Sequence, residues 1–477
     1  MSLKKNVLYN TFLTGANYIF PLITFPYISR VLGAETLGQN EFAIRIVGYF
    51  LLFASMGIAT VGTREIAKCG DDRAKRSEFF SSILFLNLLT TGIVLLVYLL
   101  SIFFFPYFSS VKDLLLIGTL QIFFTPFLIE WLYKGVEDFP YITKRSLAVR
   151  VIYVVSLFIF VREKSDIAIY FLLTVLSMVL NALFNWGYKR KYVVVTLKKI
   201  NIRRFVKPYF TFGFYSLLTS MYISFNVVFL GMVSTPIEVG YYSAATKLFS
   251  VILAFFTSFS AVMMPRMSSM FSQNDSEHAS RLIYQSFELL FPVSLTLILL
   301  GEIFAPEIIY ILSGDGYEGA IVPMRIILPL IFVIGLEQIL IVQILTPLRK
   351  DKAIFTNSVI GSIVGLLLNF LLVPHLNSIG SALVWCCSEL AVLSSASYFI
   401  IKYIGNVLPT KLLMKNIISF LLLAVIVFLI KNILNGNIYV CLIVSAVIVC
   451  MYVLLTQYFV LRNGLFVTII NKYIRRY

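Results

Sequence analysis

Two cations of this sequence stand at matched positions inside long apolar stretches. Arg45 follows Gly38 by seven residues and Lys247 follows Gly240 by seven residues, so the second pair repeats the first at an offset of 202 positions. A cation surrounded by hydrocarbon is costly unless it faces a cavity or a partner. We therefore expect Arg45 and Lys247 to form two walls of one cavity that accepts anions. The alternative is that both side chains reach outward to the lipid head groups.

Other ionisable side chains in or beside apolar stretches extend this set. Three arginines are further candidates for binding an anion: Arg30, Arg150 and Arg325. For Arg30 and Arg325 the alternative is that the side chain anchors a helix end at the membrane surface. Glu41 precedes Arg45 by four positions, which puts both on one helix face and allows an ion pair. Three more carboxylates are candidate sites for a coupling ion, H⁺ or Na⁺: Glu288, Glu337 and Glu389. Their alternative role is a structural hydrogen bond across helices, and no other cofactor is expected.

The elements that must position these side chains are transmembrane helices. The chain is 59% hydrophobic and only 13% charged, with a mean hydropathy of +0.91, whereas soluble domains are about 25% charged. Apolar windows of about 20 residues, the length of a membrane-spanning helix, recur almost end to end. They predict an all-α polytopic protein with about fourteen spans, at 8–31, 40–63, 79–103, 112–134, 143–161, 166–188, 208–232, 239–263, 281–303, 321–346, 353–373, 379–401, 411–431 and 437–460.

The basic residues indicate how these spans are oriented. Of the 39 lysines and arginines, thirty fall in loops on one side of the predicted spans, five on the other side and four within spans. Cytoplasmic loops carry such an excess, so both termini are predicted to be cytoplasmic. The net charge of +16 is thereby explained by topology, and no nucleic-acid partner is implied.

The spacing also predicts two lobes. The first six predicted spans are repeated by the next six in the same orientation, and Arg64 and Arg266 share the 202-residue offset. Such a repeat implies two lobes related by a pseudo-two-fold axis along the membrane normal, with a central cavity between them. We expect an N-lobe at 1–188, a basic linker at 189–207, a C-lobe at 208–402, and two further helices with a tail at 403–477. The linker is interpreted as a solvated connection, with contact to anionic head groups as the alternative.

Motifs for other chemistry are missing from the sequence. No G-x-x-x-x-G-K-[ST] phosphate loop is present, and the two histidines have no neighbouring metal ligands. The five cysteines are interpreted as small buried hydrophobes, without a disulfide or metal framework. The sequence therefore predicts a transporter and not an enzyme.

Three segments resemble the polysaccharide-lipid flippases of the O-antigen transporter type, in the multidrug, oligosaccharidyl-lipid and polysaccharide exporter superfamily. They are Ser29–Ala34 followed by Leu37-Gly38, Glu130–Glu137 (EWLYKGVE), and Thr346–Lys352 (TPLRKDK). The resemblance covers nearly the whole chain. It implies alternating access and a cationic cavity for the pyrophosphate and sugar, with Arg30, Arg45 and Lys247 at positions where related flippases carry cavity cations.

The resemblance also implies a substrate and a location. The substrate would be an undecaprenyl-pyrophosphate-linked oligosaccharide, a repeat unit of O-antigen, capsule or exopolysaccharide, moved to the outer leaflet of the bacterial inner membrane. A monomer would suffice, and polysaccharide polymerase machinery is an implied partner. The first rival is a multidrug or organic-cation exporter of the same superfamily, which would require cavity carboxylates. The second is a membrane glycosyltransferase or ligase, for which the largest outer loop is short.

Overall fold

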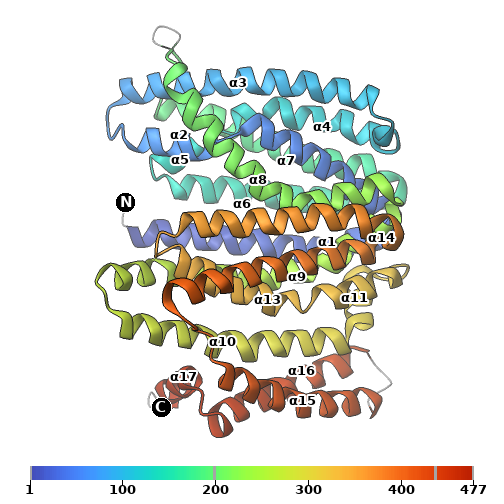
Figure 1. The fold of residues 1–477 in the computed structure, drawn as a ribbon. Helices are drawn as coiled ribbons and strands as arrows, with labels where there is room; N and C mark the ends of the chain where they lie inside the picture. The colour runs from blue at the N-terminus through green and yellow to red at the C-terminus, as the bar shows by residue number, and fades with distance from the viewer. Residues whose placement is uncertain (1–2, 197–199, 434–437, 475–477) are drawn as a thin grey trace. The chain divides into compact units, whose positions relative to one another are not determined.

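The computed structural model describes residues 3–196, 200–433 and 438–474. Within these ranges the chain is helical and contains no strand, which confirms the predicted all-α class (Figure 1). The chain divides into two compact units, Met1–Ser243 and Ala244–Tyr477. The predicted N-lobe, linker and C-terminal segment include residues outside the described ranges, namely 1–2, 197–199, 434–437 and 475–477.

The first unit contains helices α1 to α8 and the start of α9. Their bounds are α1 Leu3–Ser55, α2 Ile58–Ala67, α3 Arg73–Phe104, α4 Lys112–Phe124, α5 Glu130–Gly135, α6 Phe139–Phe160, α7 Ile167–Tyr188, α8 Arg203–Val233 and α9 Pro236–Ser272. Short 3₁₀ turns connect several of them: η1 Pro106–Val111, η2 Thr125–Phe127, η3 Lys164–Asp166 and η4 Lys189–Lys191.

The second unit contains the rest of α9 and helices α10 to α17. Their bounds are α10 Ser276–Ile303, α11 Ala305–Ser313, η5 Glu318–Ala320, α12 Ile321–Ile327, α13 Leu330–Glu337, η6 Gln338–Leu345, α14 Asp351–Ile404, α15 Thr410–Ile433, α16 Ile438–Leu455, η7 Thr456–Val460 and α17 Gly464–Ile474. The predicted tenth span is divided, because Pro329 separates α12 from α13 and a π-helical segment, η6, follows.

Two helices are each long enough for two spans. Helix α1 has 53 residues and bends at Gly33, where φ is 74°, a left-handed value that glycine adopts without steric cost. Helix α14 has 54 residues and bends at Asn377, where φ is 50°. Ten helices within the described residues are long and apolar enough to cross a membrane. Counting α1 and α14 twice and adding α6 and α8 gives fourteen crossings, in agreement with the predicted number.

The linker lies against α3. The backbone N–H groups of Val194, Thr196 and Asn201 donate to the hydroxyl groups of three serines on α3, at 3.0, 2.9 and 3.0 Å: Ser77, Ser81 and Ser82. Val193 is 1% exposed. An extended segment has no intrahelical partners for its amides, so these hydroxyls satisfy them. The described part of the linker is therefore hydrogen-bonded to α3 through its backbone, while side chains such as Val194 and Val195 are exposed, at 58% and 41%.

Candidate functional site

The repeated glycines meet in the structure. Gly38 lies in α1 and Gly240 in the second turn of α9, both are buried, and each allows the two backbones to approach closely. A Cβ atom built on Gly38 would lie 2.8 Å from the backbone nitrogen of Gly240. The spacing seen in the sequence therefore marks a real contact, which lies within the first unit.

Arg45 lies two turns beyond this contact on α1. Its Nη2 is 3.9 Å from Glu41 Oε2, and the two side chains are 41% and 14% exposed. The structure thus brings together the pair that the i, i+4 spacing predicts. The Nε atom of Arg45 is buried and has no hydrogen-bond partner among the described residues. A partly exposed guanidinium with one unused buried donor can still bind an anion through several of its five N–H groups.

Lys247 occupies the matching position on α9. Its side chain is half-buried, seven residues beyond Gly240, in the part of α9 that belongs to the second unit. An ammonium group has three rotatable donors and a compact charge. It keeps the positive charge of Arg45 without the planar fork that grips a phosphate with two parallel hydrogen bonds.

The other predicted cations have local environments of their own. Arg30 is exposed, and its Nη1 donates to the carbonyl oxygen of Pro26 at 2.7 Å. The guanidinium carbon of Arg150 lies 5.6 Å from the ring centroid of Phe20, a cation–π contact. Arg325, in the second unit, is exposed on α12 and attracts Glu302 electrostatically.

Two of the predicted carboxylates form a pair in the second unit. Glu337 at the end of α13 and Glu389 on α14 are 7% and 6% exposed, and their side chains interact electrostatically. Trp385 Nε1 donates to Glu389 Oε1 at 2.9 Å. Glu337 Oε1 is buried and has no hydrogen-bond partner among the described residues. Glu337 and Glu389 are therefore two buried neighbouring acids, one of which accepts a hydrogen bond from Trp385.

Glu288 has a different environment. Its Oε1 accepts from the backbone N–H of Gly464 at 2.8 Å and its Oε2 from that of Leu465 at 3.1 Å. Its carbonyl oxygen accepts from the Asn463 side chain at 2.9 Å. A carboxylate at the first N–H groups of a helix satisfies donors that have no intrahelical partner and complements the helix dipole. Glu288 therefore caps the C-terminal helix α17.

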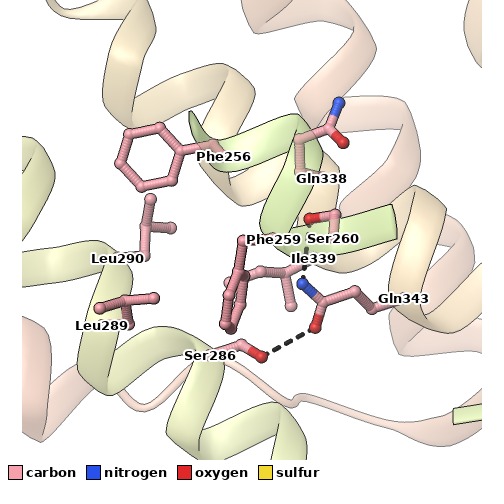
Figure 2. A pocket seen from close by; sticks show the side chains of 10 residues that line it. Phe256, Phe259, Ser260, Ser286, Leu289, Leu290, Gln338, Ile339 and Gln343 are labelled. Carbon is pink, nitrogen blue, oxygen red and sulfur yellow. Dashed lines mark hydrogen bonds between the residues drawn. The ribbon is translucent and has the colours of Figure 1, made fainter. Parts of the chain in front are cut away.

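A polar network in the second unit was not foreseen from the sequence. Gln343 on η6 donates through Nε2 to Ser260 Oγ at 3.0 Å and accepts through Oε1 from Ser286 Oγ at 2.8 Å (Figure 2). All three are buried, and they border a cavity of about 10 Å³, roughly the space of one water molecule. Their signal in the sequence is weak, because they lie in three separate apolar stretches in which other serines and glutamines, such as Ser258, Gln285 and Gln338, occur as well.

The EWLYKGVE segment proves to be part of an ion-pair network in the first unit. Glu130 lies 3.0 Å from Lys134 Nζ and 3.1 Å from Arg145 Nη2. The Arg145 side chain is only 5% exposed, and it also donates to Asn185 and Ser146. This segment therefore supports the fold, and it lies apart from the paired Glu41 and Arg45 in the chain.

Comparison with known protein families shows to which family of membrane proteins the chain belongs. Residues 3–271 match the polysaccharide biosynthesis protein family, and residues 212–371 match the MatE family. The helical fold and these matches define a multi-pass membrane transporter. The chain belongs to the polysaccharide biosynthesis protein family, within the superfamily that the three sequence segments resemble.

Two relatives and two solved structures agree with this assignment. A candidate O-antigen transporter of Escherichia coli (strain K12) is 28% identical over 412 residues, covering 84% of this chain and 97% of that protein. One of Shigella dysenteriae is 26% identical over 384 residues, covering 79% and 95%. The lipid II flippase MurJ in an inward closed conformation superposes with a TM-score of 0.76 at 14% identity, covering 95% of this chain and 98% of that chain.

A multidrug resistance MATE family transporter in an inward-facing conformation gives a TM-score of 0.60 at 17% identity, covering 83% of this chain and 92% of that chain. At these identities the structural likeness shows the fold alone. The matched relatives and neighbours are transporters and flippases, in agreement with the prediction that this chain is not an enzyme.

Proposed function

We propose that this protein flips undecaprenyl-pyrophosphate-linked oligosaccharides across the bacterial inner membrane by alternating access. The observation that carries the proposal is the family match over more than half of the chain, together with the similarity to O-antigen transporters over 84% of it. In this proposal both termini are cytoplasmic, the protein acts as a monomer, and polymerase machinery receives the flipped repeat unit. The sugar then moves from the cytoplasmic to the outer leaflet.

The cations supply the physical requirement for this transport. A pyrophosphate with a polar sugar cannot cross hydrocarbon without a polar path, because its charges and hydroxyl groups would lose their hydration. Arg45 and Lys247 lie on helices α1 and α9 at equal distances from the two glycines that touch. The equal spacing of the two cations from the two glycines supports a common anion path. In this proposal Arg30, Arg150 and Arg325 bind the anion as it enters or leaves that path.

The driving force needs little from a coupling ion. A membrane potential that is negative inside favours outward movement of an anion by about 2.3 kcal/mol per charge per 100 mV. The buried pair Glu337 and Glu389 offers a site where one proton could bind and leave during the cycle. In this proposal the membrane potential is the main driving force and proton binding by this pair adds to it, while Glu41 holds Arg45 in place.

The second candidate function is export of organic cations. The MatE family match over residues 212–371 and the MATE structural neighbour support it. Such an exporter requires carboxylates that face a cationic substrate. Here Glu41 is paired with a cation, Arg45, and the two charges at the matched positions, Arg45 and Lys247, are positive, so flipping of an anionic lipid-linked sugar is favoured.

Complementation tests the proposal. A strain that lacks its O-antigen flippase receives the wild type, Arg45→Ala, Lys247→Ala or the control Lys415→Ala, whose side chain is exposed on α15. We expect the first two variants to lose surface polysaccharide at matched membrane levels and to accumulate lipid-linked oligosaccharide on the cytoplasmic face, whereas Lys415→Ala complements. Full complementation by all variants would exclude these two cations as the anion path. A drug-sensitive phenotype without a polysaccharide defect would favour the exporter.

A further inference from the structure

A cavity of about 290 Å³ lies beside α1 in the first unit, and none of the cations assigned to the anion path lines it. Its walls come from α1, η1, the end of α8 and the start of α9, and all of its lining residues precede Ser243, the end of the first unit. We call it the outer pocket, because η1 connects the third and fourth predicted spans on the side opposite the basic loops. Ligand sites in proteins begin at about 300 Å³, so the outer pocket has room for a monosaccharide.

The outer pocket is lined by neutral residues. Its polar side chains come from α1, from η1 and from the connection between α8 and α9: Gln39, Tyr107, Ser109, Ser110 and Ser234. Among its described lining residues there is no lysine, arginine, aspartate or glutamate. The cation that follows η1, Lys112, contacts the ring of Phe103 instead, with Nζ 4.6 Å from the ring centroid. A charged ligand would lose hydration here without gaining a counter-ion, so the outer pocket suits a neutral polar ligand.

Three of these side chains have unused hydrogen-bonding capacity. Gln39 is half-buried, Tyr107 is 58% exposed and Ser110 is exposed, and none of the three side chains makes a hydrogen bond to another described residue. Ser109 Oγ donates to the carbonyl oxygen of Pro106 at 2.7 Å, which leaves its lone pairs to accept. An amide offers two donors and an acceptor, and a hydroxyl can donate and accept. Uncharged donors and acceptors of this kind match the hydroxyl groups of a sugar.

Two aromatic rings supply the apolar part of the outer pocket. Tyr107, 58% exposed, lies at its opening, whereas Phe42, 4% exposed, lies deep within it. The ring of Phe42 packs closely on α8, since a Cβ on Gly231 would lie 2.2 Å from it. An aromatic ring has a negative face, and the C–H groups on one face of a sugar ring are apolar and slightly positive. Aromatic faces beside neutral hydrogen-bonding groups are the combination that recognises a carbohydrate.

The turn that carries Tyr107 is held in place by its neighbours. Helix η1 begins at Pro106, whose ring fixes φ, and two of its side chains are packed inward: Phe108 is 6% exposed and Val111 is 3% exposed. The ring of Phe108 stacks on that of Phe105, with centroids 5.7 Å apart, and its backbone N–H donates to the Phe105 carbonyl oxygen at 3.1 Å. A binding residue on a fixed turn loses little conformational entropy when its ligand binds.

The outer pocket lies on the same helix as the predicted pyrophosphate site. Arg45 follows Gln39 by six residues and Phe42 by three, which places it about 9 Å and about 4.5 Å further along α1. In the proposed orientation this part of α1 runs inward, so Arg45 is deeper in the membrane than Gln39. A lipid-linked glycan that faces outward has the same order, with the sugar in water and the pyrophosphate at the membrane surface.

We propose that the outer pocket binds a neutral sugar residue of the lipid-linked glycan on the outer side of the membrane. Tyr107 stacks on the sugar ring, and Gln39 and Ser110 form hydrogen bonds with its hydroxyl groups. The proposal rests on the proposed flippase function and adds to it a site that selects the sugar and is separate from the cations. Because no charge takes part, binding at the outer pocket should not depend on salt, unlike anion binding at Arg45.

Saturation-transfer NMR on the purified full chain in detergent tests binding without transport. The probes are the methyl glycosides of glucose, galactose, mannose, rhamnose and N-acetylglucosamine, with methyl glucuronide as the charged counterpart. We expect saturation transfer to at least one neutral glycoside and weaker transfer to methyl glucuronide. Tyr107→Ala should lower the affinity for the neutral glycoside about tenfold, the effect of losing one aromatic face.

Two matched variants separate sugar binding from membrane anchoring. Tyr107→Phe keeps the ring face and should bind like the wild type. Phe104→Ala removes a ring that is 77% exposed at the end of α3 and does not line the outer pocket, so it should also bind like the wild type. If Tyr107→Ala does not fold, Gln39→Ala tests the opposite wall and should also weaken binding. Equal binding by Tyr107→Ala and Phe104→Ala, or transfer to none of the neutral glycosides, would overturn the sugar site.

Complementation then distinguishes this inference from the proposed function. In the strain that lacks its O-antigen flippase, Tyr107→Ala should restore less surface polysaccharide than Phe104→Ala at matched membrane levels. If the wild type binds a neutral glycoside through Tyr107 but restores no polysaccharide, the flippase function is wrong and the outer pocket remains a sugar site. If Tyr107→Ala restores as much polysaccharide as the wild type, the flippase function stands and the outer pocket has no part in it.

Discussion

The two ends of the first unit are held together in different ways. At one end α1 and α9 meet through backbone atoms at two glycines, and we call the four residues Ala34, Gly38, Pro236 and Gly240 the glycine contact. At the other end, which we call the anchored end, Arg145 binds Glu130, Asn185 and Ser146, and serines of α3 hold the linker. Buried polar networks favour one arrangement, because every broken bond leaves an unsatisfied group. A close backbone contact between glycines carries no such penalty, so the two regions differ in how strongly polar groups fix their packing.

The largest expected loss of stability follows a substitution at the anchored end. Arg145→Ala removes a cation that is 5% exposed and leaves Glu130 and Asn185 without its hydrogen bonds. Glu130 is 36% exposed and keeps its ion pair with Lys134, so the main loss is the hydrogen bond from the charged Arg145 to the buried Asn185, about 1.5–3 kcal/mol. We expect a large fall in the apparent melting temperature in mild detergent, measured against Lys144→Ala, whose side chain is exposed one residue away. Equal stability of the two variants would show that the anchored end is not stabilised by this network.

A smaller effect is expected beside the glycine contact. A Cβ on Gly231 would lie 2.2 Å from the ring of Phe42, but a ring can rotate away, whereas the carbonyl oxygen of Pro236, 1.7 Å from a Cβ on Gly38, cannot. Gly231→Ala should therefore cost about 1 kcal/mol, at the low end for overpacking, and should lower the apparent melting temperature in mild detergent less than Gly38→Ala does. A larger fall with Gly231→Ala than with Gly38→Ala would show that the packing at Phe42 is the tighter of the two contacts.

The serines that hold the linker can be tested one at a time. Ser77→Ala leaves the N–H of Val194 without its 3.0 Å acceptor, which should cost about 1 kcal/mol. We expect faster hydrogen exchange at residues 193–196, measured by mass spectrometry. Ser101→Ala on the same helix is the control, since its hydroxyl donates within α3, to Tyr98. Unchanged exchange in Ser77→Ala would mean that apolar packing alone holds the linker.

The smallest expected effect is a change in the labelling rate of the Cys69 thiol, near the anchored end. Burial raises the pKa of the Cys69 thiol, because the charged thiolate is disfavoured away from water. The reactive thiolate fraction at pH 7 is therefore below that of an ordinary cysteine and increases as the pH rises. Maleimide labelling of Cys69 should be slower than that of Asp71→Cys, an exposed neighbour tested in a Cys69→Ala background. Similar rates would indicate that this turn opens readily.

Local patterns in the sequence were sufficient for the fold class and for part of the site. Hydropathy depends only on neighbouring residues, so the apolar windows predicted the helices, including the two that join at Gly33. The i, i+4 spacing predicted the pair of Glu41 and Arg45. The 202-residue offset marked Gly38 and Gly240 before any contact between them was known.

Only the tertiary structure decided which faces meet and what each buried polar group does. Glu288 and Glu337 look alike in the sequence, yet one caps α17 through two backbone amides and the other lies beside Glu389. Gln343 finds its partners 57 and 83 residues away. Hydrogen bonds and steric contacts between distant segments depend on how helices pack, which local periodicity does not specify. The sequence by itself determined that the chain crosses the membrane and that its first six spans are repeated by the next six. The packing of the helices determined where Gly38 and Gly240 touch.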